Sequence, residues 1–297
     1  MSNYIDLLCQ TVHKIARIVA GRRLCSRTQS LPEIVTVRAI PLFLFAATIS
    51  PLSLGAQAKV HEPHVLAIFA HPDDEVTVGP VLARSARDGS RVQIVYATSG
   101  DRGTAFSGLE AGDELARLRE GEARCASAAL GIEEPAFLRL GDATLGIRAH
   151  DTESPALRFL EGVRRLLAET KPDIVITWGP DGGYGHADHR MVSALVTQAV
   201  QELEEGRPRL LYPGIRNGTL PPIPELQMWA TTDPVLLDVD QAYEAQDLSA
   251  AHAAVGCHVS QFDEATRAGL APLFDQSIWQ GAVHFREALK PPAGPGD

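Results

Sequence analysis

The chain has 297 residues, which is enough to bury the core of one large α/β domain or of two small ones. Hydrophobic residues make up 45% of the sequence and charged residues 22%, an ordinary balance for a soluble globular protein. The 27 basic and 37 acidic residues give a formal net charge of −10, which argues against a nucleic-acid binder that works through a basic face. Sugars and other neutral or cationic small molecules are easier partners.

The first 58 residues differ from the rest, because they hold six basic and only two acidic residues. Arg38 precedes an apolar stretch from about 39 to 54, and Ala56-Gln57-Ala58 follows it. That order is typical of a secretory signal peptide. The apolar stretch is short and contains two prolines, so we expect no stable membrane span after processing. We therefore expect a leader over 1–58, cleavage after Ala58, and a periplasmic or secreted single domain over 59–297.

The leader has two other interpretations. The apolar stretch could be an uncleaved anchor, or the whole segment could be a disordered extension. Thirty-seven residues also precede Arg38, which is far more than a signal peptide needs. Translation that begins near Val35 or Val37 would explain the excess, so the start site stays open.

Of the four cysteines, Cys9 and Cys25 fall in the leader, and Cys125 and Cys257 fall in the expected mature domain. Two cysteines do not make a disulfide framework, although one bridge is compatible with an oxidising compartment. Whether Cys125 and Cys257 pair stays open. Neither stands in a C-x-x-C pair, which disfavours a thiolate metal site.

Beyond residue 60, strand-like and helix-like stretches alternate along the chain. Apolar runs predict strands at 64–70, 91–97, 136–140 and 173–178. Composition and end signals predict helices at 80–88, 113–131, 154–170 and 188–205, followed by short strands at 210–215 and 234–239 and a helix at about 242–257. This alternation predicts a Rossmann-like α/β fold with a mostly parallel sheet and helices on both faces.

Polar side chains follow the first and the fourth of these strands. The first is followed by "AHPDDE", residues 70–75, and the fourth by "GGYGHADH", residues 182–189. In parallel sheets ligands bind at the carboxyl ends of the strands, so the two clusters should share one edge. At the first turn, three carboxylates stand where a dinucleotide-binding protein carries a glycine-rich loop, which disfavours a bound nucleotide.

The residue types in these clusters fit a catalytic metal site. Zinc and similar cations bind imidazole nitrogen and carboxylate oxygen, and a catalytic site keeps three protein ligands and an open position. His71 and Asp74 lie on one turn, and His186 and His189 offer further imidazoles. We therefore expect two histidines and one aspartate as ligands, with one histidine to spare. Asp73 is then free to take a proton from metal-bound water. The same ligands also suit Fe²⁺ or Mn²⁺.

Each cluster by itself has a simpler interpretation. A His–Asp pair at a strand end is often a cap or a surface salt bridge. Asp73, Asp74 and Glu75 could favour the positive end of the following helix, and His186 and His189 could cap the helix that they begin. Two such clusters at the ends of two expected strands together favour the metal site. Glu75 is left without a firm role, as either a support of the site or a helix-end charge.

"AHPDDE" followed about 110 residues later by "GGYGHADH" resembles the PIG-L/LmbE-like family of metal-dependent N-acetylglucosamine deacetylases, from about His64 to Gln261. The resemblance implies removal of the N-acetyl group from an N-acetylglucosamine-type amino sugar or its conjugate. It implies a small-molecule or glycan substrate and Zn²⁺ as the cofactor. The metal ligands that it implies are His71, Asp74 and His189, with Asp73 as the general base.

The resemblance also implies roles for the second motif. His186 would stabilise the tetrahedral intermediate, and Asp188 would orient it without binding the metal. Tyr184 matches a tyrosine of some members, which polarises the acetyl carbonyl or protonates the leaving amine. Packing in the loop is the alternative for Tyr184.

Weaker matches imply four substrate-binding residues, which are Asp101, Arg119, Asp142 and His258. Each of three has a structural alternative: a turn for Asp101, a charge pair on a helix for Arg119, and a purely structural role for His258. The family often has a lysine seven residues before that histidine, where this chain has Ala251. This difference weakens the case for substrate contacts in that segment.

Two other functions are compatible with the same residues. One is an amidase or esterase that acts on another N-acyl or acyl compound. The other is a carbohydrate-binding protein without turnover, which is disfavoured because ligands, base and acid are all present. The sequence leaves the exact substrate, the native metal and the oligomeric state undecided.

Overall fold

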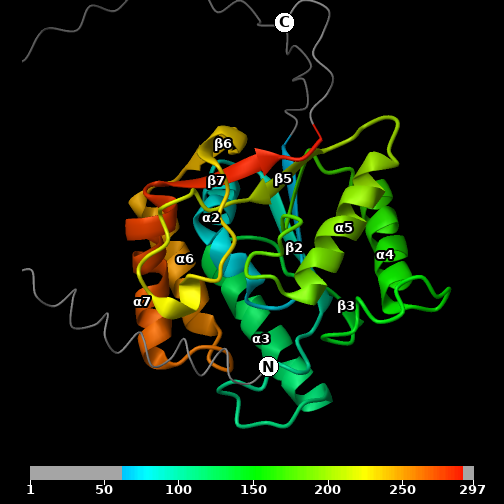
Figure 1. The fold of residues 1–297 in the computed structure, drawn as a ribbon, viewed down its shortest axis with the longest axis horizontal. Helices are drawn as coiled ribbons and strands as arrows, with labels where there is room; N and C mark the ends of the chain where they lie inside the picture. The colour runs from blue at the N-terminus through cyan, green and yellow to red at the C-terminus, as the bar shows by residue number, and fades with distance from the viewer. Residues whose placement is uncertain (1–61, 290–297) are drawn as a thin grey trace, which may run out of the picture.

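The computed structural model describes residues 62–289, which form a seven-stranded sheet with helices on both faces (Figure 1). The strand order is β3-β2-β1-β4-β5-β7-β6. The strands are β1 (His64–Phe69), β2 (Arg91–Thr98), β3 (Ala136–Leu140), β4 (Ile174–Thr177), β5 (Arg209–Pro213), β6 (Val239–Ala242) and β7 (Ala282–Glu287). The leader expected over 1–58 lies outside the described residues.

Strands β1 to β5 form the parallel part of the sheet, and β7 and β6 extend its β5 edge with antiparallel pairs. The mostly parallel, Rossmann-like sheet is therefore confirmed. The strand expected at 234–239 is wrong except at its last residue, because Pro234–Leu236 forms a 3₁₀ turn and β6 begins only at Val239. The Asp233 side chain accepts the Val235 N–H and caps that turn. The sequence analysis did not predict β7.

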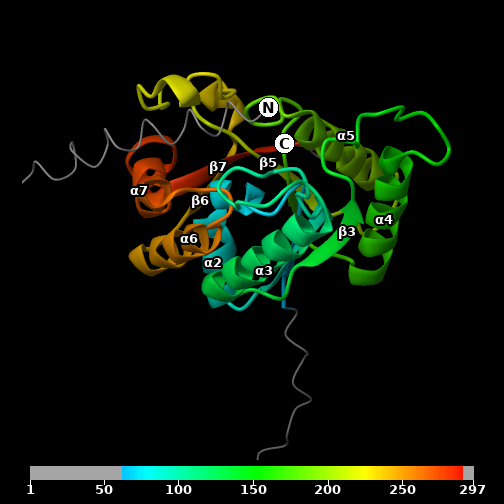
Figure 2. The ribbon, with the colours of Figure 1, turned by 90° about the horizontal axis from the view of Figure 1, so that it is seen from below.

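Helices cover the two faces unequally (Figure 2). One face carries α2 (Gly79–Arg87), α3 (Asp113–Leu130), α6 (Ala245–Cys257) and α7 (Glu264–Phe274), of which α7 was not predicted. The other face carries α4 (Pro155–Thr170) and α5 (Ala187–Gln201). Within residues 62–289, no helix is long and apolar enough to cross a membrane.

The central strand β1 is buried along its whole length. Val65, Ala67 and Phe69 belong to the core under α2, α3 and α6. Leu66 and Ile68 belong to the core under α4 and α5. Side chains alternate between the two faces of a strand, and both faces of β1 are covered, which explains its uninterrupted apolar sequence.

The strand order reverses between β1 and β4. The chain runs outward from β1 to β2 and β3, and then returns to place β4 on the other side of β1. Ligands bind at such a switch point, where the loops after two neighbouring strands diverge. The loops that carry the two polar motifs leave the sheet there, so the expectation that they share one edge is confirmed.

A disulfide joins Cys125 on α3 to Cys257, the last residue of α6. The two Cα atoms are 5.8 Å apart, although the residues are 132 positions apart in sequence. Helices α3 and α6 pack against each other on the same face of the sheet. The pairing that the sequence left open is therefore present.

Candidate metal centre and active site

Asp74 is held by three hydrogen bonds to one of its carboxylate oxygens. The turn after β1 brings the backbone N–H groups of Ala70 and His71 to Oδ2, at 2.9 and 3.1 Å. The indole Nε1–H of Trp178 donates to the same oxygen at 2.9 Å. Burial would raise the pKa of this carboxyl, but His189 and His71 hold it well below its usual range. Asp74 is therefore an oriented carboxylate whose other oxygen, Oδ1, is directed at the two histidines.

Three side-chain atoms from the two motifs converge. The His71 Nδ1 and His189 Nε2 atoms are 3.2 Å apart, and Asp74 Oδ1 lies 3.1 Å from His189 Nε2 and 3.9 Å from His71 Nδ1. Ligand atoms about 2.1 Å from a tetrahedral zinc ion lie about 3.4 Å from one another. The donor atoms, their spacing and their single negative charge therefore fit a divalent cation held by His71, Asp74 and His189.

His189 is oriented by a contact at its second ring nitrogen, Nδ1, and by stacking of its ring. Its Nδ1 lies 3.1 Å from the carbonyl oxygen of Gly182, and this contact is a hydrogen bond when Nδ1 carries the proton. The lone pair is then on Nε2, where a metal would be. The ring also stacks on Trp178, with centroids 4.4 Å apart and planes 7° apart. The sequence analysis missed Trp178, although it ends the expected fourth strand directly before the second motif.

Two carboxylates face the other ring nitrogen of His71. Its Nε2 lies 3.1 Å from Asp142 Oδ1 and 3.5 Å from Asp188 Oδ2. Burial lowers the pKa of His71, but these carboxylates and Asp74 more than offset it and raise the pKa well above its usual value. Carboxylates behind a ligating imidazole fix its tautomer and increase its basicity. This arrangement leaves Nδ1 of His71 available to bind a metal ion.

Asp142 and Asp188 therefore differ from their predicted roles. Asp142 was expected to bind substrate, but it is buried against His71, which helps to keep the pKa of its carboxyl well below normal. Asp188 was expected to orient His186. Its backbone N–H does donate to His186 Nδ1, but its carboxylate accepts the backbone N–H groups of Ala143 at 2.7 Å and Leu145 at 3.2 Å, beside His71. The loop after β3 passes behind His71, and its neighbours in space could not be read from sequence.

Asp73 is the acidic residue of the first motif that reaches the surface of the site. Its side chain is 21% exposed, whereas those of its two acidic neighbours are almost fully buried. Burial, supported by the charge of Asp74 and opposed by Arg119, raises the pKa of Asp73 to about 6. A carboxylate that is ionised at neutral pH, yet more basic than usual, suits a general base.

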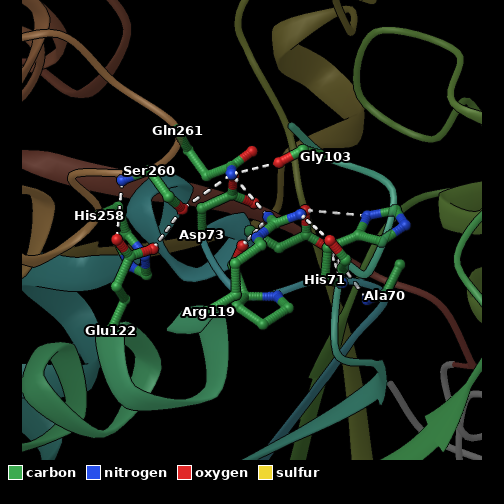
Figure 3. Close-up of polar contacts among 12 residues, drawn as sticks. Ala70, His71, Asp73, Gly103, Arg119, Glu122, His258, Ser260 and Gln261 are labelled. Carbon is green, nitrogen blue, oxygen red and sulfur yellow. Dashed lines mark hydrogen bonds and ion pairs between the residues drawn. The ribbon is translucent and has the colours of Figure 1, made fainter. Parts of the chain in front are cut away.

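Arg119 holds Asp73 from one side (Figure 3). Its Nη2 donates to Asp73 Oδ2 at 3.1 Å and to the carbonyl oxygen of Pro72, and its Nη1 donates to the carbonyl of Gly100 at 2.9 Å. The side chain is only 3% exposed. Cβ atoms at Gly100 and Gly103 would lie 2.1 and 2.3 Å from the guanidinium, so a side chain at either position would displace it. The predicted substrate contact of Arg119 is wrong, because its guanidinium is turned inward.

Glu75 and His258 hold the same turn from beneath. Glu75 Oε2 accepts the Asp73 N–H at 3.0 Å and the Tyr96 hydroxyl at 2.7 Å, while Oε1 lies 2.5 Å from His258 Nε2. Burial lowers the pKa of His258, but the Glu75 charge outweighs it and the net shift is upward. His258 is completely buried, so its predicted substrate contact is wrong and the structural alternative holds. This ion pair also gives Glu75 the role that the sequence left open.

His186 and Tyr184 lie beside the candidate metal ligands. His186 Nδ1 accepts the Asp188 backbone N–H at 3.2 Å, so Nε2 carries the proton when the ring is neutral. Burial and the nearby His71 and His189 lower the pKa of His186 to about 4, which keeps the ring neutral at pH 7. The Tyr184 ring lies 5.1 Å from the His189 ring between centroids. Both side chains can therefore donate a hydrogen bond beside the ligands.

Asp101 supports the loops at the rim. Its Oδ1 accepts the Asp142 backbone N–H at 2.9 Å, and its carbonyl accepts the Gly112 N–H at 2.8 Å. Its side chain joins the loop after β2 to the loop after β3. This contact matches the turn that was the alternative to substrate binding, and the substrate contact of Asp101 stays a prediction.

Part of the chain is similar to the PIG-L family. Residues 66–200 match the model of that family, which is described as GlcNAc-PI de-N-acetylase. The match includes most of β1, all of β4 and both polar motifs, so the family resemblance drawn from the two motifs is confirmed.

A relative of known activity is the 1D-myo-inositol 2-acetamido-2-deoxy-α-D-glucopyranoside deacetylase of Saccharomonospora viridis. It is 38% identical to this chain over 165 residues, which cover 50% of this chain and 61% of the relative. The chain therefore matches less than two thirds of the relative's length.

Solved structures show the same fold in enzymes with different reactions. A deacetylase of the teicoplanin biosynthetic pathway has a TM-score of 0.59 and 20% identity, covering 78% of this chain and 100% of that one. A zinc-inhibited form of the teicoplanin deacetylase has a TM-score of 0.57 and 18% identity, covering 77% and 100%. The 4-carboxy-2-hydroxymuconate hydratase of Pseudomonas putida KT2440 has a TM-score of 0.53 and 18% identity, covering 78% and 98%. At these identities the likeness shows the fold alone.

The contact between Asp142 and His71 predicts an effect on metal affinity. An Asp142→Asn substitution keeps the shape but removes the charge behind His71 Nε2, so we expect the dissociation constant for Zn²⁺ to rise about 10–100-fold. Competition with a chelating dye measures it. Glu153→Gln, an exposed acid away from the site, is the control and should leave the affinity unchanged. Equal affinities in both variants would contradict the assignment.

Proposed function

We propose that the chain is a metal-dependent hydrolase that removes the N-acetyl group from an N-acetylglucosamine-type amino sugar or its conjugate. The observation that carries this proposal is the convergence of His71 Nδ1, Asp74 Oδ1 and His189 Nε2 within 3.9 Å, with Asp73 on the same turn. The PIG-L family and the activity of the S. viridis relative support the deacetylase assignment.

The donor set fits Zn²⁺, and Fe²⁺ or Mn²⁺ would accept the same atoms. When bound, such a cation would act as a Lewis acid towards an acyl carbonyl and lower the pKa of water beside it. The ligands are almost fully buried and are oriented by Trp178, Gly182 and Asp142. The protein would therefore hold the ion in one geometry.

Asp73 would take the proton from the attacking water. Its carboxylate is held in place by Arg119 through Oδ2 and has a pKa of about 6, so it is largely ionised at neutral pH. As the water oxygen bonds to the acetyl carbon and the C–N bond breaks, the amine nitrogen needs a proton. The carboxylic acid formed on Asp73 can return that proton to the nitrogen.

The negative charge that develops on the acetyl oxygen would be met by His186 and Tyr184. Neutral His186 offers its Nε2–H, because Nδ1 already accepts a backbone hydrogen bond. Tyr184 offers its hydroxyl from the loop before α5. Donors that stand in place before the reaction stabilise a developing oxyanion with little reorganisation.

The fold alone does not choose this reaction, since a hydratase shares it. An amidase or esterase acting on another acyl compound is the second candidate, because the same groups would attack any activated carbonyl. A screen for acetate release with N-acetylglucosamine oligomers and conjugates, other N-acyl amines and acetate esters separates the candidates. We expect acetate and free amine from the amino sugars. Turnover of esters or other amides alone would overturn the proposal.

Two substitutions should separate the base from the ligands. Asp73→Asn keeps the metal and should lower kcat about 10²–10⁴-fold, because general-base catalysis contributes about that factor. His189→Ala should lose both the metal and the activity, because it removes a ligand. Metal content by elemental analysis and kcat by acetate release make the comparison. Full activity in Asp73→Asn would sink the base assignment.

We also propose that the protein works outside the cytoplasm. The signal-like segment that ends at Ala58 and the Cys125–Cys257 disulfide both support this location, because disulfides persist in oxidising compartments. Expression in a bacterial host followed by fractionation and intact-mass measurement tests it. We expect a mature protein that begins at Lys59 in the periplasm or medium. A cytoplasmic protein with a longer N-terminus would contradict the proposal.

A further inference from the structure

The segment at the C-terminal end of α6, residues 257–261, is joined to three parts of the site (Figure 3). We call it the anchoring segment. His258 Nε2 pairs with Glu75 under the turn of Asp73 at 2.5 Å. Ser260 donates from its backbone N and its hydroxyl to the Glu122 carboxylate at 2.7 and 2.6 Å. Gln261 donates to the Gly103 carbonyl in the rim loop at 2.7 Å.

Helix α3 reaches Asp73 from the other side. Arg119 binds the Asp73 carboxylate, Glu122 accepts both hydrogen bonds from Ser260, and Cys125 forms the disulfide with Cys257. Glu122 and Cys125 follow Arg119 at intervals of three residues on this helix. The two supports of Asp73, Arg119 and the Glu75–His258 pair, are therefore connected to each other through the anchoring segment.

The backbone of Asp73 needs such support. Its φ is 106°, a left-handed conformation that persists in a non-glycine residue only when the surroundings hold it. Its N–H donates to Glu75, which is in turn held by His258. His258 follows directly after Cys257, so the covalent bond to α3 limits how far His258 can move away from the turn.

We propose that the Cys125–Cys257 disulfide is a positioning element for the general base, and that its reduction lowers turnover by loosening the Glu75–His258 support of Asp73. This inference rests on the proposed function for its kinetic consequence. Its structural part, the coupling of the disulfide to the turn of Asp73, can be measured without any substrate.

The disulfide is open to reductants, because Cys125 is exposed and Cys257 is half-buried. A water-soluble phosphine breaks the S–S bond: the phosphine gives two electrons and becomes its oxide with an oxygen atom from water, and the two sulfurs become thiols with two protons. The double substitution Cys125→Ser/Cys257→Ser gives the same break without any reductant. Both routes start from purified protein whose bridge has been checked by intact mass, and two free thiols before treatment would overturn the proposal.

The kinetic test uses three backgrounds. In the otherwise unchanged protein, breaking the disulfide should lower kcat about tenfold with the metal content unchanged, as expected for a small displacement of a catalytic group. In Tyr184→Phe the same tenfold loss should recur. In Asp73→Asn the residual kcat should change less than twofold, because no base is left to displace. Equal losses in all three backgrounds, or no loss in the first, would overturn the proposal.

A matched control loosens the opposite end of α6. Asp247 pairs with Arg87 of α2 at 2.9 Å and lies in the first turn of α6, far along the helix from Cys257. Asp247→Ala should lower Tm and leave kcat unchanged. An equal loss of kcat in this control would mean that any weakening of α6 slows the enzyme, which overturns the specific role of the disulfide.

Hydrogen exchange gives the readout that needs no substrate. Breaking the disulfide should speed amide exchange of the peptide over residues 70–77, which contains the Asp73 N–H, and Asp247→Ala should not. Unchanged exchange overturns the proposal even if kcat falls. If the protein releases no acetate from any substrate, the proposed function fails, and the exchange measurement still decides whether the disulfide positions the turn.

Discussion

Strands β1 and β4 lie side by side and parallel, with Ile68 opposite Thr177 in the register. The loops that follow them therefore leave the sheet next to each other. The Thr177 hydroxyl donates to the Ile68 carbonyl at 2.8 Å, and the next residue, Trp178, reaches back to Asp74. A slip of one residue would turn Trp178 to the other face and remove both its bond to Asp74 and its stacking on His189. The convergence of the three candidate ligands depends on this pairing.

The acidic residues around that point do different work because their surroundings differ. A buried charge is costly unless it is paired or hydrogen-bonded. Asp74, Asp142 and Asp188 each meet a histidine of the centre together with donors from the backbone or from Trp178. Asp73 instead keeps part of its side chain exposed and meets a guanidinium. Position relative to solvent, more than residue type, separates the candidate ligand, the carboxylates that support the histidines and the proposed base.

The sequence predicted well where the strands end and which residues could bind a metal. It predicted poorly which way individual side chains point. Both motifs lie where the alternation of strands and helices put them. Arg119 and His258 were expected at the substrate, yet Arg119 binds the Asp73 carboxylate and His258 pairs with Glu75 beneath the turn of Asp73. A helix residue at a given position can face the site or the core, and a single sequence does not show which. Trp178 was missed because an aromatic residue at a strand end is usual in any buried sheet.

The sequence by itself determined that a parallel α/β sheet forms and that His71, Asp74 and His189 belong to one edge of it, because strand ends and metal-binding residue types are local properties of the chain. Only the tertiary structure decided which carboxylate supports which histidine, that Glu75 pairs with His258, and that Cys125 and Cys257 join. These contacts join segments that are tens to hundreds of residues apart. Their partners are chosen by how the helices pack on the sheet, and local pattern does not contain that information.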